Sequence, residues 1–130
     1  MTNQELIAMA KEVMTKAYAP YSHFQVGAAL LAKDGRVFTG CNVENATYGA
    51  TICAERTAVT KAVSEGVREF EKIAIVASSG EYAAPCGICR QVLFEFMPEG
   101  KVVLWSELEG EKEFALAELL PFGFRGEDIK

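Results

Sequence analysis

The sequence predicts an α/β fold: a three-layer α/β/α sandwich around a mixed five-stranded sheet. Three features of the chain predict it. Apolar residues first recur at helical spacing from Leu6 to Ala17. The turn signal Asp34-Gly35 then separates two strand-like runs, which must pair as an antiparallel hairpin. In the second half strand-like and helical runs alternate, which implies parallel neighbours in a sheet covered on both faces.

The first half of the chain is expected to form a helix, a hairpin and a second helix. Thr2 and Glu5 form the capping-box pattern that starts a helix, and Pro20 lies beyond its apolar stripe. Gly66 ends the second helix, because glycine is common just after helix C-termini. These elements are a helix that starts at the Thr2 cap and carries its apolar stripe from 6 to 17, hairpin strands at 24–32 and 36–43, a loop at 44–49 and a helix at 52–65.

The second half is expected to alternate strands with helices. Short apolar runs predict the buried strands, and Pro98 marks the end of a helix with one apolar face. Pro121 opens an irregular tail. The elements are a strand at 72–77, a helix at 86–97, a strand at 101–105, a short edge strand at 111–114 and a short helix at 115–120.

Composition excludes several classes of protein. The 130 residues suit a single domain, and because half of them are hydrophobic the chain is not expected to be disordered. The net charge is −5 and the basic residues are scattered, which argues against binding to nucleic acid. No apolar run reaches the roughly 18 residues of a membrane span. Because the N-terminus also lacks a secretory signal pattern, we expect a cytoplasmic protein.

The four cysteines are the first indication of chemistry. In a cytoplasmic protein they favour a metal site or catalysis over disulfides. Cys86 and Cys89 are three residues apart at the start of a helix, so their sulfurs can share one ion, and Cys53 could supply a third ligand. Three ligands leave a position of a zinc ion open to water. Glu55, two residues after Cys53, could move that water's proton.

The same residues allow other interpretations. A structural zinc site would need a fourth ligand, and Cys41 lies in a strand pattern that indicates a buried apolar residue. A thiol redox protein would use Cys86 and Cys89 but leave Cys53 and Glu55 unexplained, and the thiols could also simply be buried. Glu55 alone could be an ordinary exposed glutamate of a first helical turn.

Longer motifs decide between these interpretations. Cys53-Ala54-Glu55, followed by Pro85-Cys86-Gly87-Ile88-Cys89, resembles the zinc-dependent deaminase signature. The similarity extends over most of the chain, through residues 18–30, 40–46, 53–58, 61–66, 85–92 and 118–121. The sequence therefore resembles the short, homotetrameric cytidine deaminases that act on free nucleosides. This resemblance implies their fold, with residues 1–130 as one catalytic domain, and a role in pyrimidine salvage.

The resemblance also implies a reaction and a metal site. Cytidine and deoxycytidine would be hydrolysed to uridine and deoxyuridine with release of ammonia. One Zn²⁺ per chain would be bound by the three cysteines Cys53, Cys86 and Cys89, with Glu55 as the proton shuttle. Arg56 would offset the negative charge of the thiolates by hydrogen bonding to cysteine sulfur. Its alternative is an ordinary solvated helix arginine.

Substrate contacts follow from the same resemblance. Asn42 and Glu44 match the pair that binds the ribose hydroxyls, and Phe24 matches a residue that packs near the base. The backbone around Ala54 would hold the pyrimidine edge. Phe124 matches the tail phenylalanine that stacks on the base bound in a neighbouring subunit, although Phe122 leaves the register open. The alternatives are that Phe24 belongs to the core, that Asn42 serves a turn, and that both tail phenylalanines cover their own chain's core.

Related deaminases with other substrates remain to be distinguished. A deaminase of another cytosine-containing nucleoside, such as an antibiotic, shares the cysteine motifs but lacks good matches to Phe24 and to residues 42–45. A polynucleotide-editing deaminase needs a basic channel for its strand, which the charge of −5 disfavours. A non-catalytic zinc module is the third alternative. The expected partners are a nucleoside substrate and further copies of the chain, with no nucleic acid and no membrane.

Overall fold

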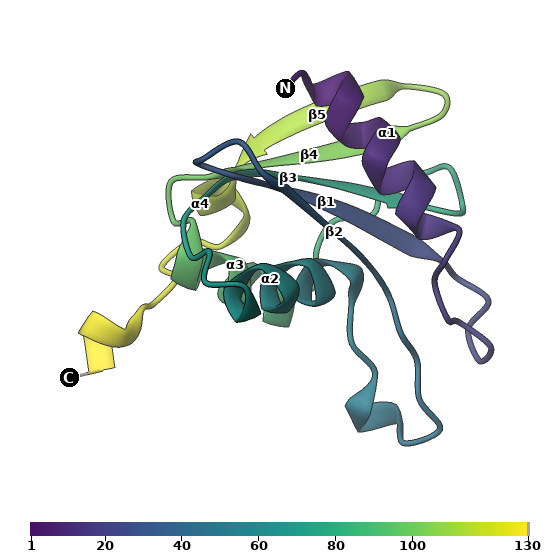
Figure 1. The fold of residues 1–130 in the computed structure, drawn as a ribbon, viewed down its shortest axis with the longest axis horizontal. Helices are drawn as coiled ribbons and strands as arrows, with labels where there is room; N and C mark the ends of the chain where they lie inside the picture. Colours follow the sequence, from purple (N-terminus) through teal and green to yellow (C-terminus); the bar gives the residue numbers. More distant parts are fainter. Residues whose placement is uncertain (130) are drawn as a thin grey trace.

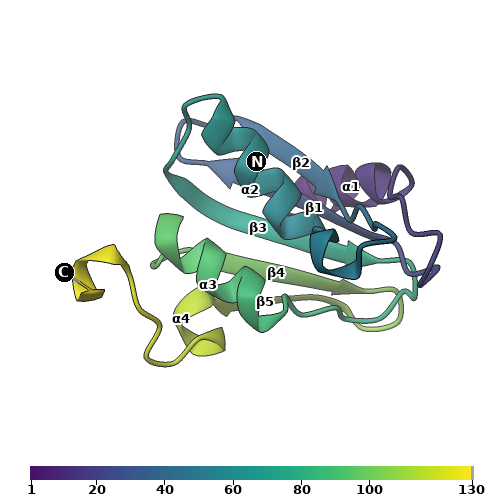
Figure 2. The ribbon, with the colours of Figure 1, turned by 90° about the horizontal axis from the view of Figure 1, so that it is seen from below.

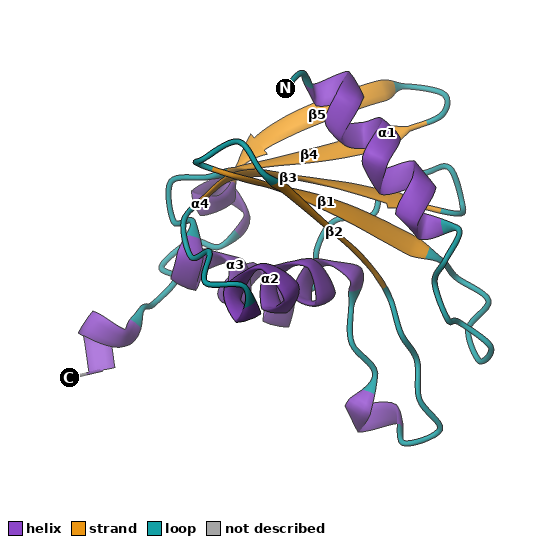
Figure 3. Cartoon of the chain, in the orientation of Figure 1, coloured by secondary structure: helices purple, strands orange, loops and turns teal. Residues whose placement is uncertain are grey.

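The computed structural model describes residues 1–129 and confirms the predicted α/β architecture. Its helices and strands are α1 (Asn3–Met14), β1 (Val26–Ala32), β2 (Val37–Cys41), α2 (Ala54–Ser64), β3 (Phe70–Ala77), α3 (Gly87–Phe96), β4 (Lys101–Ser106), β5 (Gly110–Ala115) and α4 (Leu116–Leu119). The five strands form one sheet in the order β2-β1-β3-β4-β5. Helix α1 covers one face, and α2, α3 and α4 lie on the other (Figure 1, Figure 3).

The sheet is mixed, as expected. Strand β1 pairs antiparallel with both β2 and β3, and β5 pairs antiparallel with β4. Strands β3 and β4 run parallel, and α3 makes the crossover between them. A parallel pair needs such a crossover, because both strands must start at the same edge of the sheet.

The predicted start and stop signals act where the sequence places them. Glu5 N donates to Thr2 Oγ1 at 3.1 Å and Thr2 N donates to Glu5 Oε1 at 2.8 Å, which completes the capping box of α1. Gly35 in the hairpin turn and Gly66 after α2 have φ angles of 94° and 88°. Glycine adopts this left-handed conformation without a steric cost.

Some predicted boundaries are wrong. Strand β1 begins at Val26, two residues later than expected, and β2 ends at Cys41. At this end of the pair the Asn42 side chain bonds the backbone of Phe24 and Val26, so it replaces strand pairing. The predicted loop after β2 runs into a 3₁₀ turn at Tyr48–Ala50. Strand β3 begins at Phe70, two residues earlier than predicted.

Close packing on the sheet positions the start of α2. A Cβ atom on Gly40 of β2 would lie 2.5 Å from both Ala54 O and Ala58 N. Glycine therefore lets the first turn of α2, which follows Cys53, approach the sheet directly. On the opposite face α1 packs against a second core layer, made by Leu6, Ile7, Ala10, Ala29, Leu31, Ala74, Val76 and Val103.

Two segments extend from the sandwich at opposite ends. The long loop between β2 and α2 protrudes at one end, and the yellow C-terminal tail after α4 protrudes at the other; Figure 1 and Figure 2 agree on this arrangement. The tail therefore points away from its own chain's β2–α2 loop. Among residues 1–129, no helix combines the length and apolar character needed to cross a membrane.

Candidate functional site

Three cysteine sulfurs meet where α2 and α3 begin. Cys53 is the N-cap of α2, Cys86 is the N-cap of α3, and the buried Cys89 lies in the first turn of α3. Their Sγ atoms all lie within 4.8 Å of one another, and those of Cys53 and Cys86 are 4.0 Å apart. Cys41 does not belong to this group. It is half-buried at the end of β2, so the expectation of a buried residue is wrong.

The thiols differ in their affinity for protons. An interaction with the Cys89 thiol and a hydrogen bond from Arg56 lower the pKa of Cys53 to about 5, although partial burial opposes them. The same interaction with Cys53, together with burial, raises the pKa of Cys89. A soft set of three sulfur donors, one of them with a lowered pKa, fits zinc.

Glu55 is a buried carboxyl beside the sulfurs. Only 5% of its surface is exposed, so the interpretation as an ordinary exposed helix glutamate is wrong. Burial raises the pKa of Glu55 to about 7, because desolvation disfavours the charged form. A carboxyl with this pKa can both accept and release a proton near neutral pH.

Arg56 points at the sulfurs. Its guanidinium donates from Nη2 to Cys53 Sγ at 3.4 Å, and this hydrogen bond raises the pKa of Arg56 further. Within residues 1–129 its buried Nε has no hydrogen-bond partner. The alternative of a solvated helix arginine therefore does not describe this side chain.

A hollow of about 270 Å³ adjoins the cysteines and brings most of the expected residues together. Phe24, Asn42, Glu44, Ala54 and Glu55 line it, together with the sulfur-bearing Cys53 and Cys86. Phe24 is 42% exposed, so it is not a core residue. The sequence reasoning missed the rest of the lining: Ser22, Val26, Thr51, Ile52, Ile75, Ala83 and Ala84. Ser22 and Val26 flank Phe24 within the quoted segment 18–30, and this position was the available signal.

Asn42 and Glu44 also organise the wall of this hollow. Asn42 Oδ1 accepts from Val26 N, and Asn42 Nδ2 donates to Phe24 O, both at 2.8 Å. Glu44 Oε1 accepts from Tyr21 N at 3.0 Å and from Ser22 N at 3.1 Å, and the Ser22 hydroxyl donates to Oε2. An amide keeps a second N–H and a carboxylate keeps free lone pairs, so both groups can still bind a ligand.

The tail phenylalanines lie outside the hollow. Phe122 is fully exposed and Phe124 is 53% exposed, so neither covers the core of its own chain. Phe122 has a φ of 57°, an uncommon left-handed conformation outside glycine. The tail leaves the body at the end opposite the β2–α2 loop (Figure 2). Phe124 is therefore the one expected substrate contact that this chain's own hollow does not contain.

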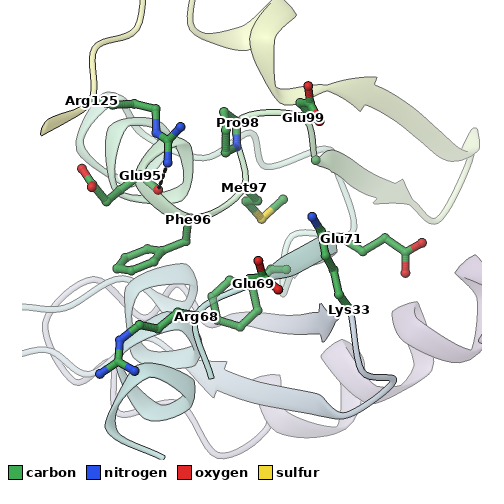
Figure 4. Close-up of a pocket in the computed structure, with 12 residues that line it drawn as sticks. Lys33, Arg68, Glu69, Glu71, Glu95, Phe96, Met97, Pro98, Glu99 and Arg125 are labelled. Atoms are coloured by element: carbon green, nitrogen blue, oxygen red, sulfur yellow. Dashed lines mark hydrogen bonds between the residues drawn. The ribbon is translucent and has the colours of Figure 1, made fainter. Parts of the chain in front are cut away.

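A larger hollow, of about 550 Å³, lies away from the cysteines (Figure 4). Its charged lining consists of the cations Lys33, Arg68 and Arg125 and the carboxylates Glu69, Glu71, Glu95 and Glu99. Because cations and carboxylates both line it, this hollow does not favour a ligand of one charge. Two of the clustered thiols, Cys53 and Cys86, and the buried carboxyl of Glu55 line the smaller hollow, so the chemistry belongs there.

Known proteins resemble the chain over nearly its whole length. Residues 1–105 match the family model of the cytidine and deoxycytidylate deaminase zinc-binding region. A cytidine deaminase of Sporosarcina psychrophila is 49% identical over 130 residues, which cover 99% of this chain and 96% of the relative. A cytidine deaminase of Halalkalibacterium halodurans is 51% identical over 130 residues, which cover 99% of this chain and 98% of the relative. The crystal structure of the Burkholderia pseudomallei cytidine deaminase is 49% identical, with a TM-score of 0.90 over 95% of this chain and 100% of that one.

Proposed function

The chain belongs to the cytidine and deoxycytidylate deaminase zinc-binding family, and we propose that it hydrolyses free cytidine and deoxycytidine to uridine and deoxyuridine, releasing ammonia, in pyrimidine salvage. It is a zinc-dependent hydrolase. The observation that supports the reaction most directly is the buried Glu55, which lies beside a cluster of three thiols and lines the adjoining hollow.

Cys53, Cys86 and Cys89 would hold one Zn²⁺ per chain. The grouped sulfurs and the low pKa of Cys53 support this assignment. When bound, zinc supplies a Lewis acid that lowers the pKa of water enough for hydrolysis near neutral pH. Three thiolates carry more negative charge than one Zn²⁺ neutralises, and Arg56 offsets part of the excess by donating to Cys53 Sγ.

Glu55 moves the protons of the reaction. Its carboxylate accepts a proton from the attacking water and donates it to N3 of the pyrimidine ring. It then takes the remaining proton of that water from the oxygen now bound to C4 and transfers it to the C4 amino group. The amino group leaves as ammonia, and a carbonyl remains at C4. A pKa of about 7 suits both directions of transfer, because neither protonation state is strongly favoured at neutral pH.

The nucleoside would lie in the hollow beside the cysteines. Asn42 and Glu44 already bond the backbone of the 21–26 segment. The remaining N–H of the Asn42 amide and the free lone pairs of the Glu44 carboxylate bind the ribose hydroxyls. Phe24 packs near the base, and the backbone around Ala54 holds the pyrimidine edge. All four residues line one hollow, which supports these roles.

The active site would be completed in a cytoplasmic homotetramer. Phe124 is half exposed on the tail and does not line its own chain's hollow, so stacking on a base bound by another subunit would give this side chain a partner. Residues 1–130 act as one catalytic domain in this assembly.

Ultraviolet absorbance tests the proposed reaction directly. Purified protein is mixed with cytidine, and deamination is followed before chelation, after chelation and after zinc is restored. The proposal requires loss and recovery of activity with the metal. A zinc-loaded protein that leaves cytidine intact would be a structural module. A protein that leaves cytidine intact but deaminates a cytosine-containing antibiotic would instead support the related antibiotic deaminases.

A further inference from the structure

Arg90, the residue after Cys89, joins two distant parts of the chain. Its guanidinium is half-buried and donates from Nε to Pro85 O at 2.7 Å and from Nη1 to Leu119 O at 2.8 Å. Pro85 is fully buried, and its carbonyl belongs to the peptide that leads into Cys86. Leu119 is the last residue of α4, where the C-terminal tail begins. One side chain therefore connects the start of the cysteine loop to the base of the tail.

The two hydrogen bonds of Arg90 require a guanidinium group. The two ion pairs within residues 1–129 are Arg36 with Asp34 and Lys72 with Glu113, so the Arg90 guanidinium bonds carbonyls rather than a carboxylate. The planar guanidinium presents its N–H groups in fixed, diverging directions, which suits two carbonyls that come from different elements. A lysine ammonium is a compact charge on a flexible stem and does not reproduce that geometry.

Further bonds hold the tail against the same helix. Gln91 Nε2 donates to Phe124 O at 2.6 Å, and Arg125 Nη2 donates to Glu95 O at 3.3 Å (Figure 4). A Cβ atom on Gly123 would lie 2.7 Å from Leu120 Cδ2 and 3.1 Å from Phe94 Cδ2, so the tail backbone also packs closely there. Helix α3 thus carries Cys89 in its first turn and holds the tail along its length.

We propose that Arg90 is a positioning residue that couples metal binding at Cys86 and Cys89 to the placement of the Phe124 tail. The inference rests on the proposed metal site and extends it. When the metal orders the first turn of α3, Arg90 fixes Leu119 relative to that turn, and Gln91 fixes Phe124 on the next position of the helix. Removing the metal then loosens the tail, and removing the Arg90 bonds loosens the metal.

Three variants test the effect of Arg90 on the metal separately from the effect of Gln91 on the tail. Arg90→Met removes both bonds of the guanidinium at similar length, so zinc release to a chromophoric chelator should be faster than in the wild type by about tenfold or more. Arg90→Lys keeps the charge but not the bridge, and it should also release zinc faster. Gln91→Met cuts only the tail link, so it should raise KM for cytidine and leave the release rate unchanged. Wild-type release from Arg90→Met would overturn the proposal.

Hydrogen exchange of the wild-type protein keeps the test valid even if Arg90→Met folds poorly. Amide exchange in the tail peptide 120–125 is compared between zinc-loaded and zinc-stripped protein, with strands β4 and β5 as the internal control. The proposal predicts faster tail exchange without zinc while the control strands change little. Equal tail exchange in both forms would overturn it. If the wild type binds zinc and deaminates cytidine in that case, the proposed function stands and only this coupling fails.

Discussion

Ser22 donates two hydrogen bonds to the carboxylate of Glu44, one from its backbone N–H at 3.1 Å and one from its hydroxyl. The Ser22 oxygen also accepts from Phe24 N at 3.1 Å. The Glu44 carboxylate and the Phe24 backbone are therefore linked through one serine, and both residues are proposed to contact the nucleoside. His23, between Ser22 and Phe24, has a φ of 58°, so the backbone turns sharply there. The segment is shaped before any ligand binds.

The first prediction concerns Ser22 and pH. The Ser22 hydroxyl bond is the main cause that holds the pKa of Glu44 below its ordinary value of 4.5. Ionised Glu44 therefore contributes to binding above pH 4.5, and in the wild type this contribution is lost only as the pH falls through the lower pKa. Ser22→Ala should move that loss to higher pH. Calorimetric titration with uridine from pH 7 to pH 4 measures it, with the remote Ser64→Ala as control. Identical profiles for Ser22→Ala and the wild type would refute the link.

The second prediction concerns the metal ligands. Cys53→Ala, Cys86→Ala and Cys89→Ala should each lose zinc, because two remaining thiolates do not complete a tight zinc site. Cys41→Ala should keep one zinc per chain and normal activity, since Cys41 lies outside the sulfur cluster. Elemental analysis of purified variants measures the zinc content. Loss of zinc from Cys41→Ala together with retention in Cys53→Ala would show that the ligand set is wrong.

Arg56 gives the third prediction. Arg56→Gln removes the cationic donor to Cys53 Sγ, so the thiolates keep more negative charge and turnover should fall by roughly 10- to 100-fold. The exposed Arg68→Gln should behave as the wild type in the same assay, because Arg68 lies away from the sulfurs. Steady-state kinetics at matched zinc content decide the matter, and an unchanged kcat in Arg56→Gln would exclude the charge-offset role.

The fourth prediction concerns Phe124. Phe124→Ala should raise KM for cytidine by roughly 10- to 100-fold, because stacking on a base contributes about 1–3 kcal/mol. Zinc content should stay unchanged, since Phe124 lies outside the cysteine cluster. Phe122→Ala is the matched control and should change KM little if Phe124 is the stacking residue. Light scattering should show four chains per particle, and a fully active monomer would end the proposal of shared active sites.

Much of the site was predictable because its chemical groups lie close together in sequence, within two short motifs. Helix geometry brings Cys86 close to Cys89 and Cys53 close to Glu55, whereas the meeting of these two pairs was expected only from the resemblance to the deaminase signature. The order of helices and strands likewise follows from apolar periodicity and turn residues. Capping by Thr2 and Glu5 is as local as a structural signal can be, and it was confirmed.

The remaining features depend on contacts between segments far apart in sequence. No local pattern indicates that Asn42 ends the β1–β2 pairing by bonding the backbone of Phe24 and Val26. The two carbonyl acceptors of Arg90 come from either side of α3, and periodicity treats Arg90 as an ordinary polar helix residue. Cys41 is half-buried because it lies on the same face of the edge strand β2 as the half-buried Val37 and Thr39, and which face of a strand is covered depends on the rest of the fold.

Turnover by Glu55→Gln tests the central claim most directly. Glutamine has nearly the same shape as glutamate, so the buried position should accept it and the three thiols should still bind one zinc per chain. Proton transfer contributes about 10²–10⁴-fold per step, and Glu55 is assigned more than one step, so cytidine turnover should fall by several orders of magnitude. Near-normal turnover by the zinc-loaded Glu55→Gln variant would contradict the account.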